Sequence, residues 1–231
     1  MGTPEATPII ILPGMDGTGE LLRALADQLA LHRPVQLLAY PRDEPLSYAQ
    51  LTTYVAERAP DRPFVVLGES FSGPIAIEIA ATDPRAAGLV LASSFARHPL
   101  PARFASLARL LDLRWLPRRI IATALMGSTG TPELTARLHR ILAALPREVL
   151  QFRAREALRV DKRNRLSEIT CPVLCLHGRF DYLVNRRQVD EIATAQPRCQ
   201  VHWLDSSHML LATHSEAAVK AINQFCAQMD K

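Results

Sequence analysis

Several residue types and patterns are scarce in this sequence of 231 residues. The longest purely aliphatic run, Ile9–Leu12, is far short of the roughly 20 apolar residues that a membrane-spanning helix needs. The first eight residues contain neither a basic nor an apolar segment, so we predict no secretory signal. Aromatic residues make up only 6% and are not interleaved with basic ones, which argues against a nucleic-acid-binding protein. We therefore expect a globular cytoplasmic protein without a transmembrane segment.

Cysteine is also sparse, with four residues in the whole chain. This number does not suggest a disulfide framework, so we expect reduced thiols. Cys171 and Cys175 are four residues apart, but no further ligands follow at the spacing of a zinc site. The sequence therefore predicts no metal site, and we expect no organic cofactor.

Charge is present but unevenly spread. The chain has 27 basic and 23 acidic residues, a formal net charge of +4. Residues 97 to 165 hold fourteen arginines and Lys162 against five acids, a balance of +10, and the rest of the chain is left with −6. One segment therefore carries the basicity of the protein.

Short apolar runs alternate with helical patterns along most of the chain. The runs are continuous rather than alternating, which is typical of parallel strands covered on both faces. We predict strands at residues 8 to 12, 35 to 40, 64 to 68, 88 to 92, 172 to 177 and 200 to 204. We predict helices at residues 20 to 31, 47 to 58, 72 to 82, 187 to 195 and 212 to 229. This order predicts an α/β fold with a mostly parallel, doubly wound sheet.

The alternation is interrupted once, in residues 97–167. This stretch has helical patterns broken by prolines and no strand pattern, so we predict a helical insertion over the sheet. One helix is expected to begin with Thr131 as N-cap and Pro132 in the first turn. The predicted organisation is a core of residues 1–96 and 168–231 and an insertion of residues 97–167.

The most informative segment is FVVLGESFSGPI, which begins at Phe64. An apolar strand passes directly into Gly-x-Ser and then into a helix, a turn that presents Ser70 above the sheet in strained backbone geometry. Ser72 stands where the Gly-x-Ser-x-Gly motif has its second glycine, and it is small enough to be tolerated. A turn that merely starts a helix has the same short pattern. The placement between strand and helix nevertheless favours a nucleophile.

A serine hydroxyl needs a base and an orienting acid to become a good nucleophile. Asp181 follows the strand predicted at 172 to 177, and His208 lies between the last strand and the last helix. Because the carboxyl ends of parallel strands meet at one edge of a sheet, we expect Ser70, Asp181 and His208 to lie together. Asp205 is the alternative acid, although its closeness to His208 favours a loop-capping role.

With the order Ser, Asp, His, the chain resembles the α/β-hydrolase superfamily over nearly its whole length. The resemblance implies an α/β-hydrolase fold that lacks the N-terminal hairpin of many relatives. It also implies an oxyanion hole formed by the backbone N–H groups of Phe71 and Met15. Met15 lies in a loop where relatives carry His-Gly-x-Gly, whereas this chain has Pro13 in place of the histidine.

The arginines of the insertion are consistent with a docking surface for an acidic partner, such as acyl carrier protein, phosphate-bearing coenzyme A or anionic lipid. The basic insertion is similar to the cap of pimeloyl-carrier-protein methyl esterases, and this resemblance implies a substrate linked to an acyl carrier protein. The simpler interpretation is a solvated surface, partly paired with the acidic core. Some apolar residues of the insertion either line an acyl pocket or merely pack its helices, namely Phe104, Leu111, Trp115 and Phe152.

We therefore predict a serine hydrolase that acts on a small-molecule carboxylic ester or thioester. Ser70 attacks the carbonyl, His208 transfers the proton, Asp181 orients His208, and water resolves the acyl-enzyme. An acyltransferase, in which an alcohol replaces water, is one alternative. Another is a small-molecule binding protein of the same fold with weak turnover. Peptide, lactone and carbon–carbon bond hydrolysis share the same machinery and also stay open.

Overall fold

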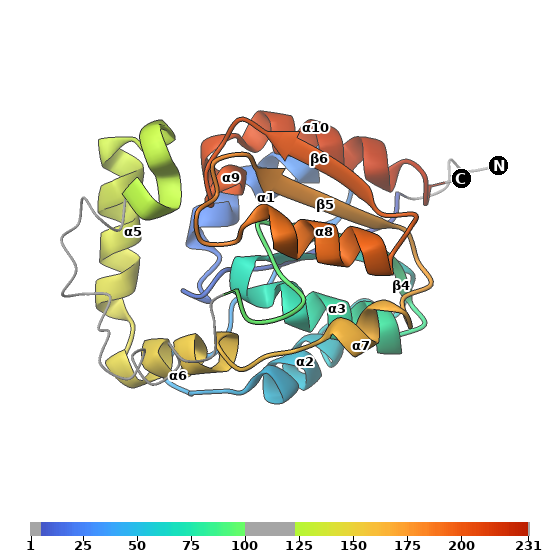
Figure 1. Ribbon diagram of the computed structural model, residues 1–231, viewed down its shortest axis with the longest axis horizontal. Coiled ribbons are helices and arrows are strands. Elements are labelled where there is room, and N and C mark those ends of the chain that lie inside the picture. Colours follow the sequence, from blue (N-terminus) through green and yellow to red (C-terminus); the bar gives the residue numbers. More distant parts are fainter. Residues whose placement is uncertain (1–5, 100–122, 231) are drawn as a thin grey trace.

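The computed structural model describes residues 6–99 and 123–230 and shows a sheet between two layers of helices (Figure 1). The described residues contribute six strands in the order β2-β1-β3-β4-β5-β6, with every neighbouring pair parallel. The strands are β1 (Ile9–Leu12), β2 (Val35–Leu37), β3 (Phe64–Glu69), β4 (Ala86–Ala92), β5 (Val173–Gly178) and β6 (Gln200–Leu204). The predicted α/β fold with a parallel sheet is confirmed. After β1 the chain continues to its neighbour β2 on one side of the sheet, and after β3 it continues to β4 on the other side. Open α/β sheets bind ligands in the crevice between two such strands.

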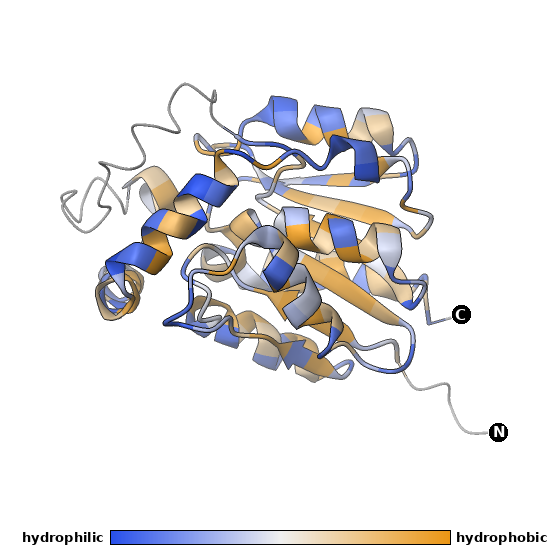
Figure 2. Cartoon of the chain, turned by 90° about the horizontal axis from the view of Figure 1, so that it is seen from below, coloured by the Kyte–Doolittle hydropathy of each residue, from blue (hydrophilic) through white to orange (hydrophobic). Residues whose placement is uncertain are grey.

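Both faces of the sheet are covered, because successive residues of a strand point to opposite sides. Ile9 packs in one apolar cluster and Ile10 in another, and both side chains are fully buried. The Ile9 face is covered by α1 (Arg23–Ala30) and α10 (Ser215–Cys226). The Ile10 face is covered by α2 (Tyr48–Ala56), α3 (Gly73–Thr82) and α8 (Arg186–Ala195). Figure 2 shows the result, with hydrophobic strands inside and hydrophilic stretches on the outer helices. Within the described ranges, none of the helices is both long and apolar enough to span a bilayer.

Some predicted elements are shorter or divided. The run at 35 to 40 forms a strand only over Val35–Leu37, half-buried at the edge of the sheet. The helix predicted from residue 20 begins as the 3₁₀ turn η1 (Glu20–Leu22). The last predicted helix is divided into α9 (Leu210–Thr213) and α10, because His214 between them has a non-helical backbone (φ −129°, ψ 43°).

Helices also follow one another in the described part of the predicted insertion. The helix α5 (Pro132–Ala144) begins as predicted, with Thr131 Oγ1 accepting a hydrogen bond from the N–H of Leu134 at 3.1 Å. It is followed by α6 (Arg147–Ala157) and α7 (Arg163–Leu166). The buried face of α5 forms an apolar cluster with Leu21 of η1, beyond the carboxyl end of β1, and with Met209, beyond the carboxyl end of β6. The helix α5 therefore stands beside the carboxyl edge of the sheet, where the predicted catalytic residues lie, whereas α7 packs against α3 and α8 (Figure 1).

Basic residues near the two ends of the insertion pair with acids of the core. Lys162 Nζ lies 2.7 Å from Glu78 Oε2, and Arg165 Nη2 lies 3.1 Å from Glu78 Oε1. Arg97 Nε lies 3.0 Å from Glu191 Oε2. Partly exposed pairs of this kind each contribute at most about 1 kcal/mol to stability. Their main effect is to fix where the insertion joins the core.

Candidate active site

The turn between β3 and α3 holds Ser70 in an uncommon backbone conformation. Ser70 has a φ of 47°, in the left-handed region that L-residues rarely adopt, and the 3₁₀ turn η2 (Ser70–Ser72) then leads into α3. Close contacts leave no room for a side chain at either of the two glycines on the two sides of Ser70. A Cβ on Gly68 would lie 2.7 Å from the carbonyl O of Ser72, and a Cβ on Gly73 would lie 1.7 Å from Ser94 Oγ. Strand, turn and helix therefore present the Ser70 hydroxyl at the carboxyl edge of the sheet.

Ser72, which replaces the second glycine of the motif, ties this turn to the loop after β1. Its side chain is buried, and its Oγ donates a hydrogen bond to the carbonyl O of Pro13. The hydroxyl of Tyr40 lies 2.5 Å from the same Oγ. Burial raises the pKa of Tyr40, so its hydroxyl stays protonated and donates to Ser72. Serine at position 72 therefore supplies a contact that glycine could not make.

The structure brings Ser70, His208 and Asp181 together from the loops after β3, β6 and β5. Ser70 Oγ lies 2.8 Å from His208 Nε2, and His208 Nδ1 lies 2.8 Å from Asp181 Oδ2. The other carboxylate oxygen of Asp181 accepts the backbone N–H groups of Leu183 and Val184, each at 2.9 Å. Because the carboxylate accepts from Nδ1, Nε2 is left free to accept the Ser70 proton.

Asp181 is buried and yet ionised at neutral pH. Burial alone would raise its pKa, but hydrogen bonds from His208 and from the Val184 N–H bring the pKa of Asp181 below its ordinary value. The neighbouring His177 donates from Nε2 to the carbonyl O of Val184 at 2.7 Å, and burial lowers the pKa of His177. Because His177 is neutral, it does not compete with His208 for the negative charge of the Asp181 carboxylate.

The alternative acid, Asp205, points away from this group. Its carboxylate is 79% exposed, and its Oδ1 lies 2.9 Å from Nε of the exposed Arg179. The loop-capping role that we expected for Asp205 is therefore wrong, since its side chain forms a surface ion pair.

A buried acid lies between the nucleophile and the loop after β1. Glu69 Oε2 accepts the backbone N–H of Gly14 at 3.1 Å. Burial and the nearby carboxylate of Asp16 raise the pKa of Glu69, His208 and the N–H of Gly14 lower it, and the net result is a pKa of about 7. Asp16 Oδ1 accepts the backbone N–H of Thr18 at 2.8 Å within its own turn. Sequence reasoning missed Glu69, because it occupies the variable position of Gly-x-Ser.

The two amides predicted to form the oxyanion hole lie on this loop and on the turn after β3. Phe71 is the second residue of η2, so its N–H has no acceptor within that helix. Its carbonyl accepts from the hydroxyl of Tyr48 at 2.9 Å, and the two rings stack with centroids 4.8 Å apart. Met15 is half-buried, and its N–H makes no hydrogen bond within residues 6–99 and 123–230. Both N–H groups are thus available, and their role stays a prediction.

Arg153 of α6 supports the same loop from the insertion. Its side chain is 1% exposed, and Nη1 donates to the carbonyls of Met15 and Asp16 at 3.1 and 2.8 Å. Nη2 donates to the carbonyl of Pro41 at 3.0 Å. Gly17 (φ 71°) packs so closely that a Cβ there would lie 2.4 Å from Nη1. Arg153 thus supports a loop that lacks the histidine of the relatives, and no sequence signal separates it from the other arginines.

The predicted acyl-pocket residues lie mostly outside the described ranges. Phe152 of α6 is half-buried, and the guanidinium of Arg155 lies 5.9 Å from the centre of its ring. Three of them fall in the undescribed segment, namely Phe104, Leu111 and Trp115. The acyl pocket therefore stays a prediction.

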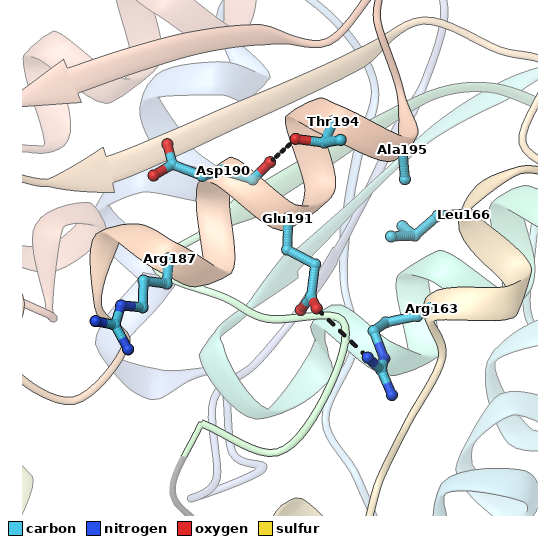
Figure 3. A pocket seen from close by; sticks show the side chains of 7 residues that line it. All are labelled: Arg163, Leu166, Arg187, Asp190, Glu191, Thr194 and Ala195. Carbon is cyan, nitrogen blue, oxygen red and sulfur yellow. Dashed lines mark hydrogen bonds and ion pairs between the residues drawn. The ribbon is translucent and has the colours of Figure 1, made fainter.

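A hollow of about 440 Å³ lies elsewhere, between α7 and α8 (Figure 3). Among its lining residues, Arg163 Nη1 lies 3.7 Å from Glu191 Oε1, and Arg187 and Asp190 add one charge of each sign. Its charges balance, and its lining contains no residue of the Ser70 group. In the described part of the chain, no group of three His, Cys, Asp or Glu side chains is arranged to hold a metal ion.

Known proteins share this fold. The sequence profile of the alpha/beta hydrolase family matches residues 9–221. The enol-lactonase from Burkholderia xenovorans is 18% identical, with a TM-score of 0.85 over 96% of this chain and 92% of that one. A thermophilic esterase from Thermogutta terrifontis is 20% identical, with a TM-score of 0.81 over 99% and 92% of the two chains. An esterase from Exiguobacterium antarcticum is 12% identical, with a TM-score of 0.84 over 97% and 93%.

Proposed function

Since the chain belongs to the alpha/beta hydrolase family, we propose that it is a serine hydrolase that cleaves a carboxylic ester or thioester through an acyl-enzyme. The observation that carries the proposal is the hydrogen-bonded series from Ser70 through His208 to Asp181. The esterases from Thermogutta terrifontis and Exiguobacterium antarcticum, which share the fold, support the choice of an ester bond.

Acylation follows from the positions of these atoms. Ser70 Oγ attacks the carbonyl carbon while His208 Nε2 takes its proton, and the carboxylate of Asp181 stabilises the imidazolium. The negative charge that develops on the carbonyl oxygen is received by the N–H groups of Met15 and Phe71. Each such donor lowers the barrier by roughly 2.7–4 kcal/mol in a measured case.

Both halves of the reaction use the same residues. Acylation ends when the tetrahedral intermediate collapses and the leaving alcohol or thiol takes the proton from His208 Nε2. Water then attacks the acyl-enzyme with His208 again as base. The carboxylic acid leaves, and Ser70 regains its proton.

Hydrolysis of p-nitrophenyl esters from acetyl to decanoyl tests this mechanism. We expect Ser70→Ala and His208→Ala to lower kcat by roughly 10⁴-fold or more, with the acyl-chain optimum measuring the pocket. Ser167→Ala and His202→Ala, at exposed positions, are the matched controls. Unchanged activity in Ser70→Ala would contradict the proposal. Acyl transfer to an added alcohol in preference to water would indicate an acyltransferase, and tight ligand binding without turnover would indicate a binding protein.

We also propose that the acyl group is presented by an acyl carrier protein that docks on α5 and α6. The exposed Arg140 and Arg147 and the half-buried Arg137 support this proposal, because they place positive charge on this part of the insertion. Charge reversal at these three positions should lower turnover of a carrier-bound substrate much more than turnover of a small ester. Equal losses on both substrates would contradict docking.

A further inference from the structure

A cavity of about 320 Å³ lies between α5, the loop after β1 and the loop after β2. Arginine side chains reach it from two of these elements, with Arg42 on the loop after β2 and Arg137 and Arg140 on α5. Glu20 is the single acid among the described residues that line it. The cavity is therefore lined by three guanidinium groups and one carboxylate.

Contacts within the protein leave much of this positive charge uncompensated. Arg42 Nη2 lies 2.9 Å from Glu20 Oε1, and Arg137 Nη2 donates to the backbone carbonyl of Glu20. Arg140 makes no hydrogen bond or ion pair within the described ranges. Among the described residues, the lining thus keeps a balance of +2, and the guanidinium of Arg140 has no acceptor.

Several other basic side chains of the insertion are compensated by protein groups. Arg163 Nη2 lies 2.6 Å from Asp161 Oδ2, and Arg165 Nη1 lies 2.7 Å from Glu168 Oε2. Arg153 is held by backbone carbonyls. The cavity instead gathers three arginines around one described acid, Glu20, and like charges brought together in this way favour binding of an anion.

We propose that Arg42, Arg137 and Arg140 form a subsite for a phosphate group of the substrate. That the phosphate belongs to a substrate rests on the proposed hydrolase function. Guanidinium groups donate pairs of hydrogen bonds to phosphate oxygens, and a phosphate dianion balances the charge of +2.

The lining of the cavity shares a loop and an apolar cluster with residues next to the Ser70 group. Thr18 lines it and belongs to the loop that carries Met15, one of the two predicted oxyanion donors. Ile141 and Leu145 form its apolar wall and belong to the same cluster as Met209, which directly follows His208. The subsite therefore suits an ester or thioester whose alcohol or thiol part carries a phosphate.

Binding of inorganic phosphate tests the subsite without catalysis. We would titrate phosphate by calorimetry, at an ionic strength held constant with sodium chloride, into the wild type, Arg140→Gln, Arg42→Gln and Arg186→Gln. Arg186 is the matched control, an exposed arginine of α8 whose Nε lies 3.6 Å from Asp190. We expect saturable binding by the wild type and Arg186→Gln and binding weakened roughly tenfold in the other two variants.

Equal phosphate binding by all four proteins, or no saturable binding, would overturn the subsite. Arg42 and Arg140 lie on different elements, so a loss shared by both variants, with unchanged circular-dichroism melting, reports the cavity and not a local folding defect.

Matched substrates test whether the phosphate belongs to the substrate. Acyl-phosphopantetheine is compared with acyl-N-acetylcysteamine, a thioester without phosphate, and 1-acylglycerol 3-phosphate is compared with monoacylglycerol. We expect kcat/KM for the phosphorylated member of one pair to be about tenfold higher in the wild type and in Arg186→Gln. In Arg140→Gln the ratio should approach one.

The responding pair identifies the source of the phosphate. Ratios near one in both pairs with the wild type would overturn the proposal, even if all four substrates are hydrolysed. Phosphate binding without turnover of any ester would instead refute the hydrolase function and leave the anion site standing.

Discussion

The sheet core and the helical insertion acquire their structures in different ways. In the core, continuous apolar strands such as β1 are buried on both faces, and the connections between them deliver polar residues to one edge. In the insertion, α5 buries one apolar face, and Ala157 and Leu166 pack into the core cluster. Polar contacts of Arg153 and Lys162 with the core add to this packing. Local sequence patterns therefore specify the core, whereas contacts across long stretches of sequence place the insertion.

The two regions contribute different parts of the candidate site. The core supplies Ser70, His208 and Asp181, which lie within hydrogen-bond distance of one another. The insertion supplies Arg153, which holds the carbonyls of the loop after β1. The difference teaches that Ser70, His208 and Asp181 can be brought together by the core alone, while the loop that carries the predicted donor Met15 is supported by a separate segment.

After the changes at Ser70 and His208, the largest effect is expected in the core, at Asp181. Asp181→Asn removes the charge that stabilises imidazolium and offers His208 the wrong hydrogen-bond partner. We expect kcat for ester hydrolysis to fall by roughly 10⁴-fold with the fold intact. Asp205→Asn is the control, because Asp205 is exposed and pairs with Arg179. Equal losses of kcat in the two variants would show that Asp181 has no specific role in the reaction.

A smaller loss should follow from breaking the contact between the two regions at Arg153. Arg153→Met fills the same space without donating to the loop carbonyls, so the loop is no longer fixed. We expect kcat to fall by roughly 10²-fold, the scale of losing one oxyanion donor, with little change in KM. Arg155→Met on the same helix should leave kcat unchanged, since Arg155 Nε donates within α6, to the carbonyl of Gln151. A rise in KM with kcat unchanged would mean that Arg153 acts only on substrate binding.

The buried acid beside the nucleophile predicts a pH effect on the stability of the core. The pKa of Glu69 is raised from 4.5 to about 7, so the folded state favours the protonated form. The stability that this form contributes is complete below pH 4.5 and is lost as the pH rises through 7, a change of up to about 3 kcal/mol.

Urea unfolding at pH 5 and pH 8 measures this change. Glu69→Gln keeps an acceptor for the N–H of Gly14 but cannot ionise, so its free energy of unfolding should fall less between the two pH values. Glu57→Gln, at an exposed position, should behave like the wild type. The same pH dependence in Glu69→Gln would contradict the prediction.

The smallest effect is expected in the insertion alone, at the start of α5. Thr131→Ala removes the hydrogen bond that caps the helix, at a cost of about 1 kcal/mol. Thr135→Ala in the same helix removes no cap and places a better helix former there, so it should not destabilise the protein. Thermal unfolding of both variants measures the difference. Equal unfolding temperatures of the two variants would mean that the apolar face of α5 holds the helix without a contribution from the Thr131 cap.

Much of the core and of the reacting group could be predicted from sequence because the signals are local. Ser70 lies between a run of apolar residues and a helix, and His208 follows the last strand directly. The ends of elements were less predictable. The run from 35 to 40 is a strand for only three residues, because β2 is an edge strand with one neighbour.

The supporting residues could not be predicted, since their roles depend on distant contacts. Arg153 donates to Met15 and Asp16, which lie 138 and 137 residues away in sequence. Glu69 is adjacent to the nucleophile, yet its raised pKa results from burial and from the charge of Asp16. Neither property leaves a pattern in the residues that flank these side chains.

The packing of Arg153 against Gly17 also couples α6 to the shape of the loop after β1. The turn at Gly17 is closed by its N–H bond to Gly14 at 3.0 Å, and its carbonyl accepts from the N–H of Tyr40 at 2.7 Å. The guanidinium of Arg153 fills the space that a side chain at position 17 would occupy. A displacement of α6 would therefore also remove the support of the loop that carries Met15.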